Sequence, residues 1–161
     1  MKDLAQLAGF MAAHGIWCVE DGEPLIPMLA YIDEFGKRVL ERFATEFLED
    51  GAAQARAALE KGVSGARCAL TVIDGYMPLD GGKCDALFIE AKVLGEEKAG
   101  FSFALPYRNA LNEGGFAVHR PKFLALPVGG SVEEIAGWFF EGVAQHEKGA
   151  ELWNRCLDES R

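Results

Sequence analysis

The sequence predicts an α+β protein in which an antiparallel sheet of five to seven strands packs with helices from both ends of the chain. Strand-like segments separated by short turns run through residues 66–128, a pattern typical of an antiparallel meander. The two ends instead repeat apolar residues at helical spacing. Of the 161 residues, 50% are hydrophobic and 25% are charged, which is typical of a soluble protein. This length predicts one domain over residues 1–161.

The N-terminal segment is predicted to form a helix from Asp3 to Ala13. Asp3 suits the N-cap, and Gly15 suits the C-terminal end because glycine adopts a positive φ without strain. The β-branched and aromatic run IWCVE (16–20) is predicted to be a short strand. A second strand is predicted in the apolar run PLIPMLAYID (24–33), after the turn residues DGEP.

The next segment is ambiguous between helix and strand. Gly36 occupies a position typical of a hairpin loop, which favours a strand at 37–43. A helix is predicted near 48–61, where Leu48, Ala52, Ala55 and Leu59 share one face. Because glycine destabilises a helix interior, Gly51 leaves open a later start with Asp50 as the N-cap.

The last part of the chain is predicted to form a helical pair that packs on the sheet. Ser131 and Glu134 have the spacing of a capping box at the start of the first helix. Gly149 is expected to end this helical run. Residues 150–157 then form a short terminal helix.

The net charge of −9 works against two classes of partner. Nucleic-acid binding depends on neutralising phosphates with Lys and Arg, so nucleic acid is not expected as a partner. The longest apolar run, around 123–128, is far shorter than the ~20 residues that span a bilayer, so no membrane association is expected. Asp3 and Gln6 interrupt the N-terminal apolar stretch, which argues against a signal peptide.

The cysteines and the common motifs point to no cofactor chemistry. Four cysteines are spread along the chain without a CxxC pair, which favours free, buried thiols and a cytoplasmic protein. The chain contains no GxxxxGK[ST], GxGxxG, HExxH or GxSxG motif. No cofactor is expected, but an enzyme is not excluded, because catalytic residues scattered over several strands leave no local signature.

Two sets of side chains have a structural and a functional interpretation. His14 and Cys18 have the spacing of two metal ligands on one helix face, but Gly15 is expected to end the helix between them. Asp74 and Asp85 flank a glycine-rich turn together with Asp80, and paired carboxylates perform acid–base chemistry or hold a cation. Turn formation is favoured, because tight turns use Asp and Gly.

The leading ligand-binding candidates are Tyr107, Arg108, His119 and Arg120, which surround a loop containing Gly114 and Gly115. Such a cationic patch would bind a carboxylate or phosphate group of a small ligand, with Arg giving a bidentate contact. Successive strand residues face opposite sides, so the neighbours His119 and Arg120 are not expected to point into the same pocket. Arg108 and His119 are therefore the better pair for one ligand. In the structural interpretation, these cations pair with the protein's own carboxylates.

The C-terminal aromatic residues Trp138, Phe140 and Trp153 are candidates for a partner surface, because they exceed what one core-facing helix stripe needs. The leading functional hypothesis is a small cytoplasmic accessory protein without catalytic activity that binds a protein partner or forms a homodimer. The alternative is a small-ligand enzyme or binding protein that uses the cationic patch. No motif assigns the chain to a family of known function.

Overall fold

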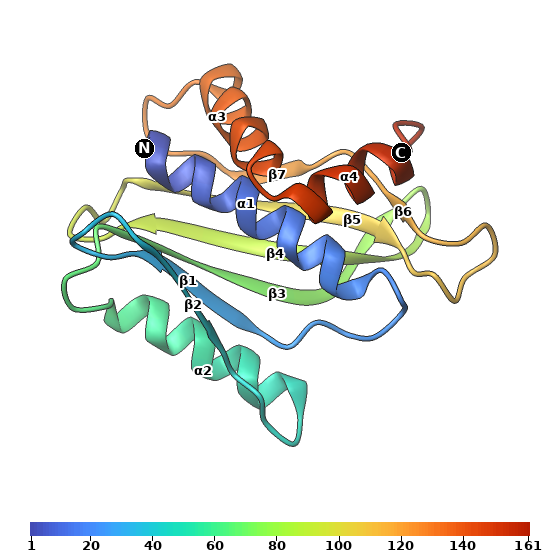
Figure 1. Ribbon diagram of the computed structural model, residues 1–161, viewed down its shortest axis with the longest axis horizontal. Helices are drawn as coiled ribbons and strands as arrows, with labels where there is room; N and C mark the ends of the chain where they lie inside the picture. Colours follow the sequence, from blue (N-terminus) through green and yellow to red (C-terminus); the bar gives the residue numbers. More distant parts are fainter.

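The antiparallel sheet forms the middle of the molecule, and helices cover both of its faces (Figure 1). The computed structural model describes all residues from Met1 to Arg161 and confirms the α+β class. The seven strands are β1 (Met28–Ile32), β2 (Arg38–Arg42), β3 (Cys68–Leu79), β4 (Gly82–Val93), β5 (Gly100–Arg108), β6 (Ala117–Val118) and β7 (Lys122–Ala125). The four helices are α1 (Lys2–Val19), α2 (Leu48–Lys61), α3 (Val132–Ala144) and α4 (Glu147–Cys156).

The strands follow the order β2, β1, β3, β4 and β5, and both β6 and β7 pair with the outer edge of β5. The long β3–β4 hairpin is paired throughout, from Cys68 opposite Val93 to Leu79 opposite Gly82. In contrast, β1 pairs with β3 only as far as Val72. The rest of β3, from Ile73 onward, therefore has no strand partner on its β1 side.

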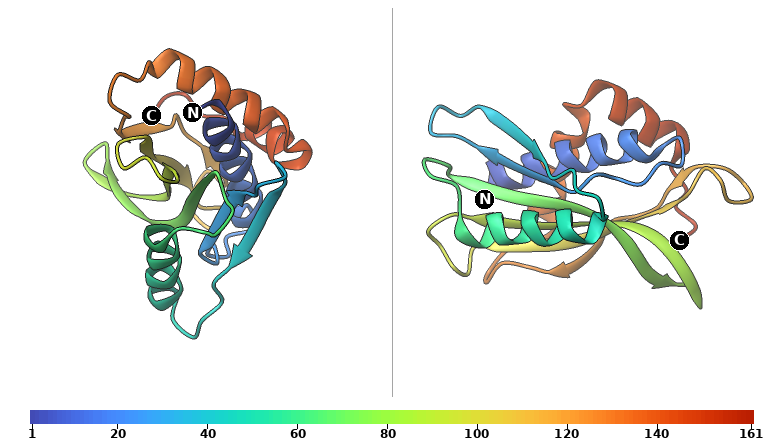
Figure 2. Two further views of the ribbon diagram at one scale, coloured as in Figure 1. Left: turned by 90° about the vertical axis from the view of Figure 1, so that its left-hand side faces the viewer. Right: turned by 90° about the horizontal axis from the view of Figure 1, so that it is seen from below.

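The two faces of the sheet are covered unequally. Helices α1, α3 and α4 lie on one face, and α2 lies on the other (Figure 2). The main core, a cluster of 29 buried residues, lies under the three-helix side. Beneath α2, the buried cluster contains only Leu29, Leu59 and Ala69. Most of the hydrophobic stabilisation therefore comes from packing α1 and the C-terminal helices on the sheet.

The predicted strand at 16–20 is wrong, because α1 continues through Gly15 to Val19. Gly15 is buried in the helix interior, and a Cβ at this position would lie 2.7 Å from Cδ1 of Leu87 on β4. The glycine therefore permits close packing of helix on sheet instead of ending the helix.

The strand predicted at 37–43 is confirmed as β2, and Gly36 has the positive φ of +81° that a hairpin turn requires. The helix at 48–61 is also confirmed, but it begins at Leu48 and not after an Asp50 cap. Gly51 lies inside α2, where a Cβ would meet the Phe43 carbonyl oxygen at 2.3 Å. Close approach of the preceding loop therefore explains this helix glycine.

The C-terminal helical pair is confirmed. The Ser131 side chain accepts a hydrogen bond from the Glu134 amide at 3.3 Å, as an N-cap does. The second helix begins earlier than predicted, at Glu147, because His146 caps it by accepting from the Gly149 amide at 2.9 Å. None of the helices has the length and apolar composition that a bilayer-spanning helix requires.

Candidate functional site

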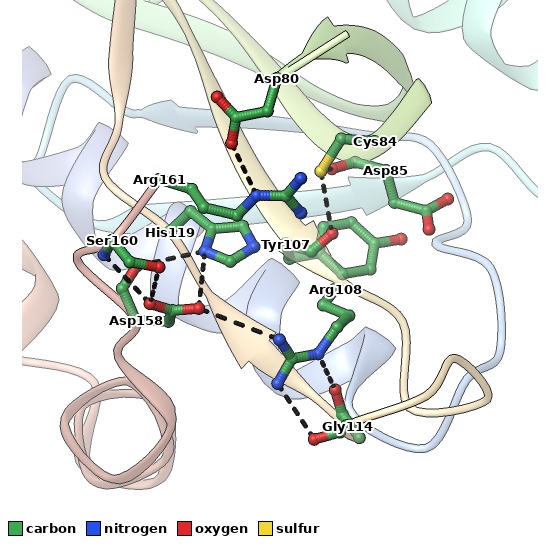
Figure 3. Close-up of polar contacts among 11 residues, drawn as sticks. Asp80, Cys84, Asp85, Tyr107, Arg108, Gly114, His119, Asp158, Ser160 and Arg161 are labelled. Atoms are coloured by element: carbon green, nitrogen blue, oxygen red, sulfur yellow. Dashed lines mark hydrogen bonds and ion pairs between the residues drawn. The ribbon is translucent and has the colours of Figure 1, made fainter. Parts of the chain in front are cut away.

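The predicted cationic residues Arg108 and His119 are brought together at one carboxylate of the chain itself. Asp158 Oδ2 lies 3.9 Å from Arg108 Nη1 and 3.8 Å from His119 Nδ1 (Figure 3). Asp158 follows α4, so the C-terminal segment supplies the anion. This arrangement agrees with the structural interpretation, in which the cations pair with the protein's own carboxylates.

The other two predicted ligand-binding residues lie apart from this pair. Arg120 is exposed and faces Glu159 on the surface at 3.7 Å. The Tyr107 side chain is buried in the core, and its hydroxyl donates to the carboxylate of Asp74 at 2.9 and 3.0 Å. The alternating direction of strand side chains separates Tyr107 from its neighbour Arg108.

Tyr107 instead belongs to an open cavity of about 530 Å³. This volume lies within the range of small-molecule binding sites. The cavity lies between the segment after α1, the first turns of α2 and the unpaired part of β3. Its lining residues from the first two elements include Gly22, Pro24, Leu25, Pro27, Leu48, Glu49, Ala52 and Arg56.

Strand β3 meets this cavity with its edge and not with one face. Four consecutive residues, Ile73 to Tyr76, line the cavity, although successive strand side chains point to opposite faces. No strand pairs with this part of β3 on the β1 side, and no backbone hydrogen bond joins it to residues 20–27. The cavity therefore opens on the main-chain edge of a strand.

Two carboxyl groups, Asp74 and Asp85, line the same cavity. The register places Asp85 opposite both Tyr76 and Tyr107, so these side chains share the face that carries Asp74. Asp74 also accepts a hydrogen bond from the Leu25 amide at 3.2 Å, which ties the segment after α1 to the site. The carboxylate of Asp85 has no ion-pair or hydrogen-bond partner on another residue.

Burial dominates the electrostatics of the site. Desolvation raises the pKa of the Asp74 carboxyl, and the nearby Asp85 charge raises it further. Burial also raises the pKa of Asp85. The pKa of the Tyr107 hydroxyl is strongly raised, first by burial and then by the Asp74 charge, so it remains a hydrogen-bond donor.

The cavity lining has an excess of negative charge, with three carboxyl groups, those of Glu49, Asp74 and Asp85, and one cationic side chain, that of Arg56. Neither Asp74 nor Asp85 forms an ion pair with a Lys, Arg or His, and Arg56 lines the cavity without such a contact. No group of three or more His, Cys, Asp or Glu side chains lies close enough to hold a metal ion. The arrangement suits a ligand that supplies N–H donors or an organic cation.

Turn formation is the favoured prediction from the sequence for Asp74, Asp80 and Asp85. Only Asp80 behaves as a turn residue, with a positive φ of 50° and an ion pair to Arg161 at 2.8 Å. One signal for Asp74 was present in the sequence. Leu70, Val72 and Asp74 alternate along β3, which places a carboxylate in line with the buried face.

The possible ligand pair His14 and Cys18 lies on α1, since the helix does not end at Gly15. The imidazole of His14 contacts that of His146, with His14 Nδ1 3.0 Å from His146 Nε2. His146 Nδ1 also accepts the Gly149 N–H at 2.9 Å, and Arg42 Nη2 lies 3.3 Å from His14 Nε2.

The three aromatic residues predicted as a partner surface occupy different environments. Trp153 is only 3% exposed and packs in the core, so it does not form a surface. Trp138 is half-buried, whereas Phe140 is 49% exposed. Four further apolar residues are exposed near Phe140 in the sequence: Leu124, Leu126, Val128 and Val132.

No family model matches this chain, and neither the curated proteins nor the solved structures contain a significant match.

Proposed function

We propose that the protein is a small cytoplasmic accessory protein, without catalytic activity, that binds an extended segment of a partner polypeptide in the cavity beside β3. A Lys or Arg side chain of the bound segment faces Asp74 and Asp85. The observation that carries the proposal is the unpaired edge of β3, which lines this cavity together with two carboxyl groups, Asp74 and Asp85, that form no ion pair.

The strand edge favours a polypeptide over a small molecule. An unpaired edge presents N–H and C=O groups that pair readily with another strand. Binding by strand addition uses these main-chain groups for affinity and pockets for side chains for specificity. Residues 73–77 cover roughly 17 Å at 3.3 Å per residue, enough to pair with a short extended segment.

The two carboxyl groups favour a basic side chain in that segment. Burial opposes the ionised form of Asp74, and a cation within about 4–6 Å would favour it. A bound ammonium or guanidinium group would therefore compensate for the desolvation of both carboxylates. A Glu at the same place in the partner would add a third negative charge and be rejected.

Selection from a random nine-residue peptide library on the immobilised protein tests the proposal. We expect binders to share one Lys or Arg flanked by β-branched residues. Enrichment of peptides without a basic residue, or no enrichment, would contradict the proposal.

The tightest-binding peptide then serves to test side-chain recognition by Asp74 and Asp85 separately from main-chain pairing with β3. Fluorescence anisotropy should show at least a tenfold weaker Kd for the Asp74→Asn/Asp85→Asn variant, about 1.4 kcal/mol. The Glu96→Gln variant, altered at an exposed turn, serves as the control and should bind as the wild type does. Methylation of a peptide nitrogen whose N–H faces β3 should abolish binding, whereas methylation of the alternate nitrogens, whose N–H groups face away, should leave binding unchanged.

Self-association is a second candidate, favoured by the exposed apolar residues between β7 and α3. The outer edge of β7 has no strand partner, and Val128 is 83% exposed. A second copy fits this surface because an antiparallel strand pairs with its own copy across a two-fold axis. Light scattering should then give twice 17.5 kDa for the wild type and a monomer for Leu124→Lys. A monomeric wild type at high concentration would exclude this candidate.

A further inference from the structure

The cavity beside β3 has two halves, which lie on opposite faces of this strand. Residues 73–76 all line the cavity, and β3 pairs with β4 without a bulge, so its side chains alternate between the two faces. Val72, two residues before Asp74, lies in the main core under α1, α3 and α4. Ala69, four residues before Ile73, lies in the cluster beneath α2. Even-numbered residues of 73–76 therefore lie on the three-helix face, and odd-numbered residues lie on the α2 face.

The half on the three-helix face is acidic. Asp74 and Asp85 both lie there, because the register places Asp85 opposite Tyr76 and Tyr107, and Tyr107 donates its hydroxyl hydrogen to Asp74. The one cationic residue of the lining, Arg56, comes from α2 on the other face. A ligand side chain on the three-helix face therefore meets two carboxyl groups and no cation of the lining.

The half on the α2 face is mainly apolar and has no net charge. Ile73 of β3 lies there with Leu48 and Ala52, which come from the first turns of α2. The two charged lining residues of α2, Glu49 and Arg56, have opposite signs. Leu48 is 40% exposed, so an apolar ligand group that covers it would remove further apolar surface from water. A ligand side chain on this face therefore gains most by being apolar.

A strand that pairs with the open edge of β3 continues the sheet, so its side chains alternate between the same two faces. When one of its residues points to Asp74 and Asp85, the residues before and after it point to the α2 face. We propose that the bound segment has the pattern apolar–basic–apolar, with the two apolar neighbours of the Lys or Arg packed against Leu48 and Ile73. This pattern rests on the peptide binding proposed above and defines which partner segments the cavity accepts.

The same geometry excludes a run of basic residues. In a Lys-Lys-Lys segment the outer two side chains would point to the α2 face, where packing against Leu48 and Ile73 desolvates their charges and Arg56 repels them. Glu49 compensates for at most one of them. The cavity should therefore reject a segment that simple electrostatic attraction to a chain of net charge −9 would favour.

Three synthetic nine-residue peptides with blocked ends test the pattern. Each has a central Lys, flanked on both sides by Val in the first peptide, by Ser in the second and by Lys in the third, and the other positions are Ser and Thr. We expect fluorescence anisotropy in about 0.15 M salt to give the Val-flanked peptide a Kd at least tenfold tighter than that of either other peptide. Because the Lys-flanked peptide has the highest charge, nonspecific electrostatic attraction predicts that it binds most tightly instead.

A protein variant locates the apolar contact. Leu48→Gln should weaken binding of the Val-flanked peptide at least threefold and leave binding of the Ser-flanked peptide unchanged, since only the Val side chains pack against Leu48. The matched control is Phe35→Gln, which alters an apolar residue that is 87% exposed in the β1–β2 turn and does not line the cavity. This control should bind all three peptides as the wild type does.

The outcomes separate the alternating pattern from the peptide binding on which it rests. Equal affinities for the Val-flanked and Ser-flanked peptides, both reduced in Asp74→Asn/Asp85→Asn, would overturn the pattern and leave basic-peptide binding intact. Tightest binding of the Lys-flanked peptide would also overturn the pattern. If none of the three peptides binds the wild type, the proposed function fails together with the pattern. The peptide comparison uses the unaltered protein, so it decides the question even if Leu48→Gln does not fold.

Discussion

Asp74 links the cavity beside β3, the proposed binding site, to the stability of the fold. Its carboxyl is held by the Leu25 amide and the Tyr107 hydroxyl, yet burial still raises its pKa. The native state therefore binds a proton at Asp74 more tightly than the unfolded chain does. The contribution of Asp74 to stability falls as the pH rises from about 3.9 through its native pKa. At neutral pH this residue destabilises the unliganded protein.

The Asp74→Asn variant should consequently be more stable than the wild type at pH 7. The amide oxygen still accepts from Leu25 and Tyr107, while the buried charge is removed. We expect a gain of roughly 1 kcal/mol, or a Tm increase of about 2–4 °C for a protein of this size. Urea unfolding at pH 7 and pH 4.5 tests whether the buried charge is the cause, since the gain in unfolding free energy should be smaller at the lower pH. A variant less stable than the wild type at pH 7 would disprove the assignment.

His14 predicts the opposite pH dependence. Burial, His146 and Arg42 lower the pKa of His14 from 6.5 to about 4. The unfolded chain then binds more protons between these values, so stability is present above pH 6.5 and is lost as the pH falls towards 4. The free energy of unfolding, measured by urea denaturation between pH 7.5 and 4.5, should depend less on pH for His14→Gln than for the wild type. The same pH dependence in both proteins would show that the pKa of His14 does not differ between the folded and unfolded states.

The candidate site was only partly predictable from single residues. The alternation of strand side chains was enough to pair Arg108 with His119, which lie at the same carboxylate. The same rule could not assign Asp74 and Asp85 to a cavity, because Asp beside Gly is typical of a turn. Their site depends on where β1 begins, at Met28, and on the position of α2, and both are properties of the tertiary structure.

At the level of elements, glycines set the contact between α1 and α3. A Cβ at Gly9 would lie 1.8 Å from the Phe139 carbonyl oxygen, and a Cβ at Gly142 would lie 2.0 Å from that of Gln6. The two backbones therefore approach each other too closely for any other residue at these positions. This contact fixes α3 on α1, which in turn packs on β3 and β4.

Substitution of Gly142 by alanine should destabilise the protein by about 3 kcal/mol, since the backbone atoms that it meets cannot move aside without separating the helices. Gly137 on the same helix is the matched control, because it is exposed and a Cβ there would meet no atom within 4 Å. Alanine at 137 should stabilise by up to about 1 kcal/mol through helix propensity. Thermal melts of the two variants check the difference in sign, and a tolerated Gly142→Ala would contradict the close helix contact.

The fold was largely predictable because turn and cap residues mark most element boundaries. Gly36, Ser131 and the hairpin turns correctly located β2, α3 and the meander. The errors arose at Gly15 and Gly149, which were interpreted as helix-ending residues. In both cases the glycine lies inside a helix and permits close packing, against Leu87 and Ala13 respectively. Sequence alone does not distinguish a glycine that ends a helix from one that packs.

At the level of the whole molecule, the cavity beside β3 and the C-terminal residues 157–161 lie around the same end of the sheet. The cavity borders β3 and reaches Asp85 and Tyr107, while Arg161 of the C-terminal segment holds the β3–β4 turn through Asp80. Residues 157–161 do not line the cavity.

Amide hydrogen exchange resolved by NMR, with and without a bound basic peptide, tests the central claim most directly. If the peptide adds a strand to β3, amides on the open edge within residues 73–77 should exchange rapidly in the free protein and become protected in the complex. Amides of β7, Lys122–Ala125, should be unaffected. Protection at β7 or on α3, with no change in residues 73–77, would contradict the proposal that the cavity beside β3 is the binding site.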